Sequence, residues 1–250
     1  MRFETWNPTT GCDRASPGCD HCYAMNRAAR LKLDGSRRYQ VDGDPRTSGP
    51  GFALQLWPDK LDMPYHWREP RSVFVNSMSD VFHRLVPDEF IRRIFAVIED
   101  TPQHHYEMLT KRSQRLARMA PSLPWPDNLW MGVTVENQRY SFRADHLRQV
   151  PSVIRFLSVE PMLGLLRLDL DGIDWVRCGG ETEPGYRDLD PSWVRSLRDQ
   201  CVAASVPFQF MHWSGLHRSD HGRMLDGQVW DQRPSAPESL GPLLTQGRRR

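Results

Sequence analysis

The sequence predicts an α/β fold, a partial (β/α) barrel of about six parallel strands. From residue 72 onward, short apolar runs rich in β-branched and aromatic residues alternate with stretches of helical spacing. This alternation is typical of βαβ units, whose strands form a parallel sheet. A length of 250 residues suits one barrel-sized domain. An open, doubly wound sheet is the alternative architecture.

The predicted strands and helices take turns along the chain. Apolar residues within 87–99 recur at helical spacing, and Pro87 and Asp88 suit a helix start. Asp190 is placed to cap the last helix, with Pro191 behind it. The strands are predicted at residues 72–76, 105–110, 129–135, 153–159, 175–178 and 206–211. The helices are predicted at residues 87–99, 113–119, 138–149 and 191–204.

We expect a single domain over residues 1–234, followed by an irregular basic tail at 235–250. Glycine and proline interrupt residues 34–71, which are predicted to form a long excursion across the barrel mouth. No apolar run approaches the roughly 20 residues that span a bilayer, and the N-terminus lacks the apolar core of a signal peptide. These features predict a cytoplasmic protein with no membrane partner. A net charge of +2 gives no global attraction to nucleic acid.

Three of the five cysteines, Cys12, Cys19 and Cys22, stand near the N-terminus with the spacing C-x6-C-x2-C. Such clustering favours metal binding over disulfides, and thiolates suit zinc or iron–sulfur clusters. Structural zinc sites are closed by four ligands, whereas three thiolates leave a cubane cluster with one open iron. We therefore predict a [4Fe–4S] cluster. A zinc site completed by His21 or Cys178 is the alternative.

Polar side chains follow the carboxyl ends of five successive predicted strands, the end at which βα barrels build their active sites. Such residues either cap the following helices or bind a ligand. Their recurrence at the same strand end favours a ligand. The set comprises Asn76, Ser77, Ser79, Asp80, Thr110, Lys111, Arg112, Thr134, Glu136, Asn137, Ser158, Glu160 and Glu181.

The stretch from Cys19 to Tyr23, placed at a helix start ahead of a βα barrel, resembles the cluster-binding end of radical S-adenosylmethionine (radical SAM) enzymes. The usual spacing in that superfamily is C-x3-C-x2-C, and this chain departs from it. The chain is also similar to a family of uncharacterised phage and bacterial proteins with a three-cysteine motif. The segments that carry this similarity are TWNPTTGC, PGCDHCYA, VNSMSDVFH, LTKRSQRL, GVTVENQ, FLSVEPML, CGGETEPGYR and GRMLDGQVWDQRP.

The resemblance implies a radical-SAM-type partial barrel whose cluster cleaves S-adenosylmethionine to a 5′-deoxyadenosyl radical that acts on an unknown substrate. A reductant such as flavodoxin or ferredoxin is implied, and nucleic acid or a nucleotide is a candidate substrate. Cys178 is a candidate hydrogen-atom donor, against the alternative of a small core residue. By analogy, the cofactor is expected to contact Tyr23, Asn76, Ser77, Ser79, Asp80, Thr110, Lys111, Thr134, Glu136, Asn137, Glu160 and Glu181.

Two other functions fit the same residues. In the first, zinc stabilises a nucleic-acid-binding module whose phosphate contacts would come from Arg27, Arg30, Arg37 and Arg38. In the second, the cluster is structural and the barrel is a hydrolase, with acid, base or metal-ligand roles for Asp80, Glu136 and Glu160.

Overall fold

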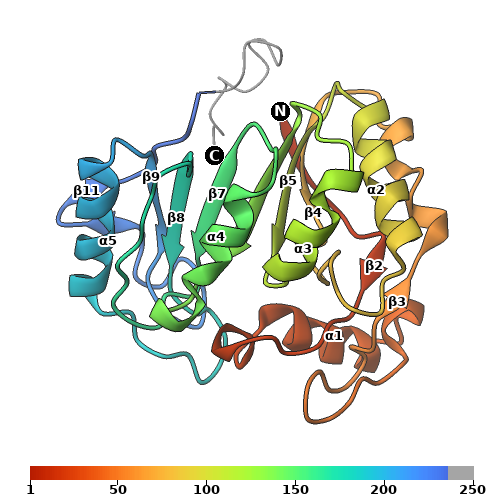
Figure 1. The fold of residues 1–250 in the computed structure, drawn as a ribbon. Helices are drawn as coiled ribbons and strands as arrows, with labels where there is room; N and C mark the ends of the chain where they lie inside the picture. The colour runs from red at the N-terminus through yellow and green to blue at the C-terminus, as the bar shows by residue number, and fades with distance from the viewer. Residues whose placement is uncertain (236–250) are drawn as a thin grey trace.

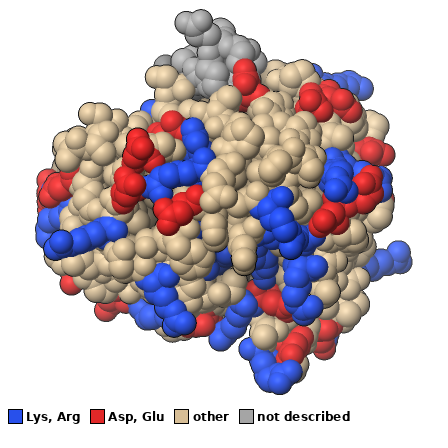
Figure 2. Space-filling model, viewed as in Figure 1, with Lys and Arg blue, Asp and Glu red and all other residues tan. Residues whose placement is uncertain are grey.

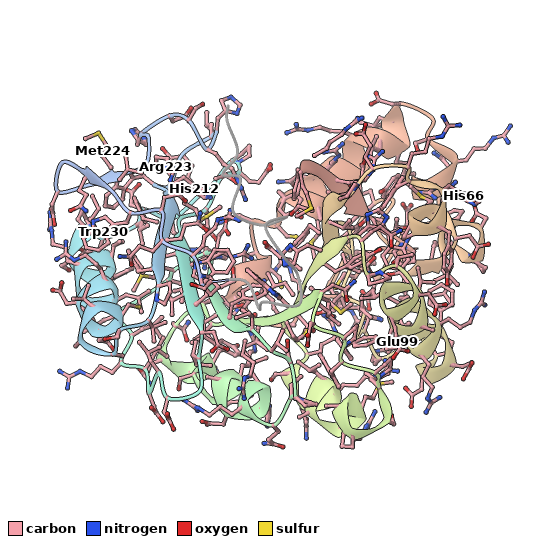
Figure 3. The ribbon with its side chains drawn as sticks, turned by 90° about the horizontal axis from the view of Figure 1, so that it is seen from above. His66, Glu99, His212, Arg223, Met224 and Trp230 are labelled. Carbon is pink, nitrogen blue, oxygen red and sulfur yellow. The ribbon has the colours of Figure 1, made fainter. Side chains whose placement is uncertain are left out.

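Seven parallel strands form one curled sheet in the computed structural model, which describes residues 1–235. Seen from above, the sheet is a half-barrel with helices on its convex side (Figure 3). The strand order is β1-β4-β5-β6-β7-β8-β9, and every neighbouring pair is parallel. The strands are β1 (Arg2–Trp6), β4 (Arg71–Val75), β5 (His105–Thr110), β6 (Leu129–Thr134), β7 (Arg155–Val159), β8 (Trp175–Gly179) and β9 (Phe208–His212). The predicted α/β partial barrel is confirmed, with one strand more than expected.

Four helices cover the convex face, and the main core lies between them and the sheet. In β5, the alternating side chains Tyr106 and Met108 enter this core, while Glu107 and Leu109 point to the other face. Asp190 caps the last helix, since its Oδ1 accepts the N–H of Ser192 at 2.7 Å. The helices are α2 (Asp88–Asp100), α3 (Ser113–Met119), α4 (Phe142–Arg148) and α5 (Pro191–Ala203).

The helix predicted at 138–149 is divided into a 3-10 turn and α4. Asn137 caps the turn by accepting the N–H of Arg139. The short 3-10 turns are η1 (Pro17–Cys19), η2 (Arg37–Tyr39), η3 (Pro58–Lys60), η4 (Met63–His66), η5 (Ala120–Ser122) and η6 (Gln138–Tyr140). Two small antiparallel pairs join β2 (Thr9–Thr10) to β3 (Gln55–Leu56) and β10 (Met224–Leu225) to β11 (Gln228–Val229).

Helix α1 (Tyr23–Leu33) lies across one end of the sheet, opposite the end at which the chain starts (Figure 1). Because β1 starts at the N-terminus and all seven strands are parallel, α1 lies at their carboxyl ends. The excursion predicted at 34–71 contains η2, β3, η3 and η4, and β3 ties it to β2. The predicted tail at 235–250 lies, apart from Ser235, outside the described residues.

No helix within residues 1–235 combines the length and the apolar character that a membrane span needs. Acidic and basic side chains are both spread over the face shown in Figure 2, in keeping with the nearly balanced charge of the chain.

Candidate active site

The three clustered cysteines lie between β2 and the start of α1, at the carboxyl ends of the sheet strands. Cys12 follows Gly11, whose φ of +83° and close approach to the Ala53 carbonyl admit only glycine. Cys19 ends η1, and Cys22 is the N-cap of α1. The Gly11 N–H donates to the carbonyl of Met78 at 2.9 Å, which fixes this segment beside the end of β4.

The thiols of these cysteines lie close enough to influence one another electrostatically. Burial, which the Arg112 charge opposes and the negative charges of Asp80, Cys19 and Cys22 reinforce, raises the pKa of Cys12 to about 12. Burial also raises the pKa of Cys22, although the N–H groups at the start of α1 and the nearby Lys111 oppose that shift. Without a bound metal, Cys12 and Cys22 are therefore protonated thiols at neutral pH.

Two cationic side chains stand beside the thiols. Arg112 binds Asp80 at 2.9 Å, donates to the Asp13 carbonyl at 2.8 Å and lies against Cys12. Burial alone would lower the pKa of Lys111, but negative charge on Cys19, Glu136 and Cys22 outweighs it and raises the pKa. When the three cysteines lose their protons, the positive charges of Lys111 and Arg112 therefore lie close enough to stabilise the thiolates.

We call residues 11–23, which carry the three cysteines, the cysteine segment. Polar residues after β4 and β5 hold it in place. Ser79 Oγ donates to the Gly11 carbonyl at 2.6 Å, and the Tyr23 hydroxyl donates to the Ser77 carbonyl. Burial would raise the pKa of Asp80, but the Arg112 charge and the hydrogen bond from Thr110 hold it below its usual value. These residues fasten the cysteine segment to the sheet.

Glu136, after β6, holds the middle of the segment. Its side chain is fully buried, accepts a hydrogen bond from Ser16 Oγ and pairs with Arg143 at 3.0 Å. Arg143 also donates to the Thr134 carbonyl at 2.8 Å, which ties the pair to the end of β6. Gly18 packs directly on the Glu136 side chain.

Glu181, after β8, holds the end of the segment. His21 Nδ1 lies 2.8 Å from its Oε2, and the Arg187 guanidinium pairs with the same carboxylate. Arg187 also donates to the Pro17 carbonyl at 2.8 Å. Burial would raise the pKa of Glu181, but the hydrogen bonds from Arg187 and His21 keep it below its usual value.

Asp13 is held by His83 from beyond β4. His83 Nε2 lies 2.9 Å from Asp13 Oδ2, and the Leu85 N–H donates to His83 Nδ1 at 3.3 Å. Nδ1 is therefore an acceptor and Nε2 the protonated nitrogen of a neutral ring. Burial and the Arg112 charge lower the pKa of His83, in agreement with the neutral form.

Glu160 and His212 form a separate pair at the ends of β7 and β9; Figure 3 labels His212. Their side chains meet at 2.8 Å, and Arg218 donates to the same Glu160 oxygen at 2.8 Å. Burial would raise the pKa of Glu160, but His212 and Arg218 lower it to about 2. His212 Nδ1 faces the Trp213 carbonyl at 3.1 Å.

The other predicted residues have partners or positions of their own at the strand ends. Asn76 Nδ2 donates to Thr9 Oγ1 at 2.5 Å, and Asn137 caps η6 by accepting the N–H of Arg139. Ser158 Oγ is buried and has no hydrogen-bond partner among residues 1–235. Cys178 is fully buried in the convex core, with its sulfur 3.7 Å from that of Met162, so it faces away from the cysteine segment.

Several residues that complete the site escape the sequence analysis. The pattern shows only that polar residues within the cysteine segment need partners, and it does not indicate which partners these are. The residues concerned are Asp13, Ser16, His83, Arg143, Arg187, His212 and Arg218.

No group of three or more His, Cys, Asp or Glu within residues 1–235 has its donor atoms gathered to hold one metal ion. The two imidazoles nearest the cysteine segment, His21 and His83, are each engaged by a carboxylate.

The family model described as Protein of unknown function (DUF5131) matches residues 2–234. No curated protein and no solved structure matches the chain. The assignment to a radical-SAM-like family is therefore wrong, because the matching model is of another family and no radical SAM model matches. The resemblance to radical SAM enzymes depends on the short stretch from Cys19 to Tyr23. Two cysteines placed just before a helix also occur outside that superfamily, so this stretch does not identify it.

Proposed function

We propose that this chain, which belongs to the family described as Protein of unknown function (DUF5131), is an enzyme with a [4Fe–4S] cluster on Cys12, Cys19 and Cys22. The observation that carries the proposal is the convergence of three thiols, Cys19 buried and Cys12 and Cys22 half-buried, beside Lys111 and Arg112 at the carboxyl ends of a parallel half-barrel. This is the end at which βα barrels place their chemistry.

The donor set suits a cluster better than a single ion. A single zinc needs four donors, each sulfur about 2.3 Å from the metal. Residues 1–235 hold no such gathered group, and the nearby His21 and His83 have other partners. A cluster binds each thiolate to a different iron, so its three cysteines stand further apart than the ligands of one ion.

The residues around the thiols fit the charge of a thiolate-bound centre. Its low access to water makes the Cys12 thiol resist deprotonation, and nearby positive charge favours the thiolate form. The Arg112 charge stabilises the thiolate of Cys12, while the Lys111 charge and the N–H groups at the start of α1 stabilise that of Cys22. The anchors of the segment, Glu136 and Glu181, hold the three cysteines at fixed positions.

We further propose S-adenosylmethionine as the cofactor and flavodoxin or ferredoxin as the class of reductant. When bound, a reduced cluster of this kind supplies the electron with which that sulfonium is cleaved. Of the residues at the mouth, Lys111 offers a cation for a carboxylate. Glu160, held anionic by His212 and Arg218, offers an acceptor for hydroxyl or amino groups.

Anaerobic reconstitution with iron and sulfide tests the cluster. We expect a brown protein with about four irons per chain, and loss of the colour in Cys12→Ala, Cys19→Ala and Cys22→Ala. Cys201→Ala is the matched control, because Cys201 is buried in α5, away from the segment. Stoichiometric zinc without iron, or four irons retained in any of the three variants, would contradict the proposal.

Formation of 5′-deoxyadenosine tests the cofactor. The reconstituted protein, with dithionite and S-adenosylmethionine, is expected to form it, whereas the three cysteine variants are not. An intact cluster that yields none would remove S-adenosylmethionine and leave the cluster assignment standing.

The hydrolytic alternative has one supporting observation, the Glu160–His212 pair. The other two carboxylates that it would use already have partners. Asp80 binds Arg112 and Thr110, and Glu136 binds Arg143 and Ser16. Hydrolysis that survives loss of the cluster and disappears in His212→Ala would favour this alternative.

A further inference from the structure

Helix α1 presents two faces of opposite character. Ala24 and Ala28 are buried, 4% and 0% exposed, against the small core cluster that includes Phe52. Arg27 and Arg30, three residues apart, are exposed. The helix is therefore fixed by its alanine face and leaves its arginine face open to solvent.

The outward arginines have no acidic partner in the part of the chain that the structure describes. Within residues 1–235, the guanidinium groups of Arg27, Arg30 and Arg37 make no ion pair and no hydrogen bond, and Arg38 stacks on Trp57 at 4.9 Å. Arginines that hold the cysteine segment, such as Arg112, are by contrast paired with carboxylates. Residues 21–42 carry five basic side chains and two acidic ones, so positive charge is concentrated here in a chain of nearly balanced charge.

An exposed aromatic ring begins the same helix. Tyr23 directly follows Cys22, is 43% exposed and is oriented by its hydrogen bond to the Ser77 carbonyl. Arg27 and Arg30 follow it by four and seven residues, so the three share one side of the helix. We call Tyr23, Arg27 and Arg30 the α1 basic stripe. Helix α1, which carries the stripe, lies across the carboxyl ends of the strands (Figure 1).

We propose that the α1 basic stripe docks a single-stranded nucleic acid and delivers one of its bases to the thiol centre. An arginine stripe neutralises phosphates, and an exposed ring beside it offers a stacking platform for a base. The strand must be single, or locally unpaired, because Cys19 is only 8% exposed and a base inside a duplex does not reach a recessed centre. The delivery step rests on the function proposed above, whereas the docking does not.

Fluorescence anisotropy with a labelled single-stranded 20-mer tests the docking, with metal-free full-length protein at a series of salt concentrations. We expect affinity to fall steeply with salt. Arg27→Glu combined with Arg30→Glu should weaken binding at least tenfold and reduce the salt slope by about 1.4, since each lost phosphate contact removes about 0.7. Tyr23→Ser should weaken binding by about tenfold, whereas Tyr23→Phe, which keeps the ring and loses only the hydrogen bond to the Ser77 carbonyl, should weaken it less.

The matched control is Arg118→Glu combined with Arg167→Glu, two exposed arginines outside α1 that make no ion pair within residues 1–235. It should change neither affinity nor slope. No binding at low salt, an equal effect of the control, or a duplex that binds as tightly as the single strand would overturn the inference. Because the protein is metal-free, strand binding without a cluster on reconstitution would refute the proposed function alone. A cluster without strand binding would refute the docking alone.

Discussion

Gly18 and Glu136 touch so closely that a Cβ on Gly18 would stand 2.5 Å from the Cγ of Glu136. Glu136 does not yield, because it is fully buried and held by both Ser16 and Arg143. The turn that carries Cys19 therefore rests on the end of β6 through a contact that only glycine permits. The position of the thiols is thus coupled to a strand more than a hundred residues away in the chain.

Replacement of this glycine should displace the cysteine segment. We expect Gly18→Ala to lower the free energy of unfolding by roughly 1–3 kcal/mol through overpacking and to lose most of the reconstituted iron. Gly164→Ala is the control, because its Cβ would meet Asn137 at an ordinary 3.7 Å. Iron content equal to that of the unmodified protein would show that the segment finds its position without this contact.

Removal of Arg112 should destabilise the protein even without a metal. Arg112→Ala leaves the buried Asp80 carboxylate without its ion pair, and a broken buried pair costs about 3 kcal/mol or more. Urea unfolding of the metal-free protein under anaerobic conditions measures the change. Arg92→Ala, which removes only an exposed pair with Glu89, should cost less than about 0.5 kcal/mol. A similar cost for both would deny Arg112 its anchoring role.

Lys111 should tune the reduction potential of the proposed cluster. A positive charge near the cluster favours its reduced, more negative form, so Lys111→Met is expected to shift the potential to more negative values. Anaerobic redox titration followed by absorbance measures the shift. Lys60→Met, which replaces a lysine paired with Asp59 on η3, should leave the potential unchanged. An unchanged or more positive potential in Lys111→Met would place Lys111 away from the cluster.

The strands were predictable where burial on both faces makes them continuous apolar runs. All six residues of β6 are buried, and the pattern indicates this strand to within one residue. β1 escaped prediction because only its last residue, Trp6, is buried, so its hydrophobic signal is weak. Pairing with β4 places these five residues in the sheet, and a local pattern carries no information on that pairing.

The sequence predicts which residues form the candidate site, but it does not predict which side chains contact one another there. Spacing alone indicates three cysteines that act together, and polar strand ends indicate where they meet. The partners depend on the fold, because Ser16 lies 120 residues from Glu136 and His21 lies 160 residues from Glu181. Asp80, which the sequence predicts to bind a cofactor, contacts Arg112 and Thr110 in the structure, and only three-dimensional proximity decides these contacts.

The Glu160–His212 pair should appear as a pH dependence of stability. Glu160 has a pKa of about 2 in the folded protein against an ordinary 4.5, so its contribution of about 3 kcal/mol is present above pH 4.5. It is lost as the pH falls toward 2. The difference in unfolding free energy between the unmodified protein and Glu160→Gln should therefore be constant above about pH 5 and shrink below it, as urea titrations at successive pH values would measure. Glu89→Gln, an exposed control, should show a difference near zero throughout. If the Glu160→Gln difference stayed constant down to pH 3, the carboxylate would not be stabilised by His212 and Arg218 in the folded state.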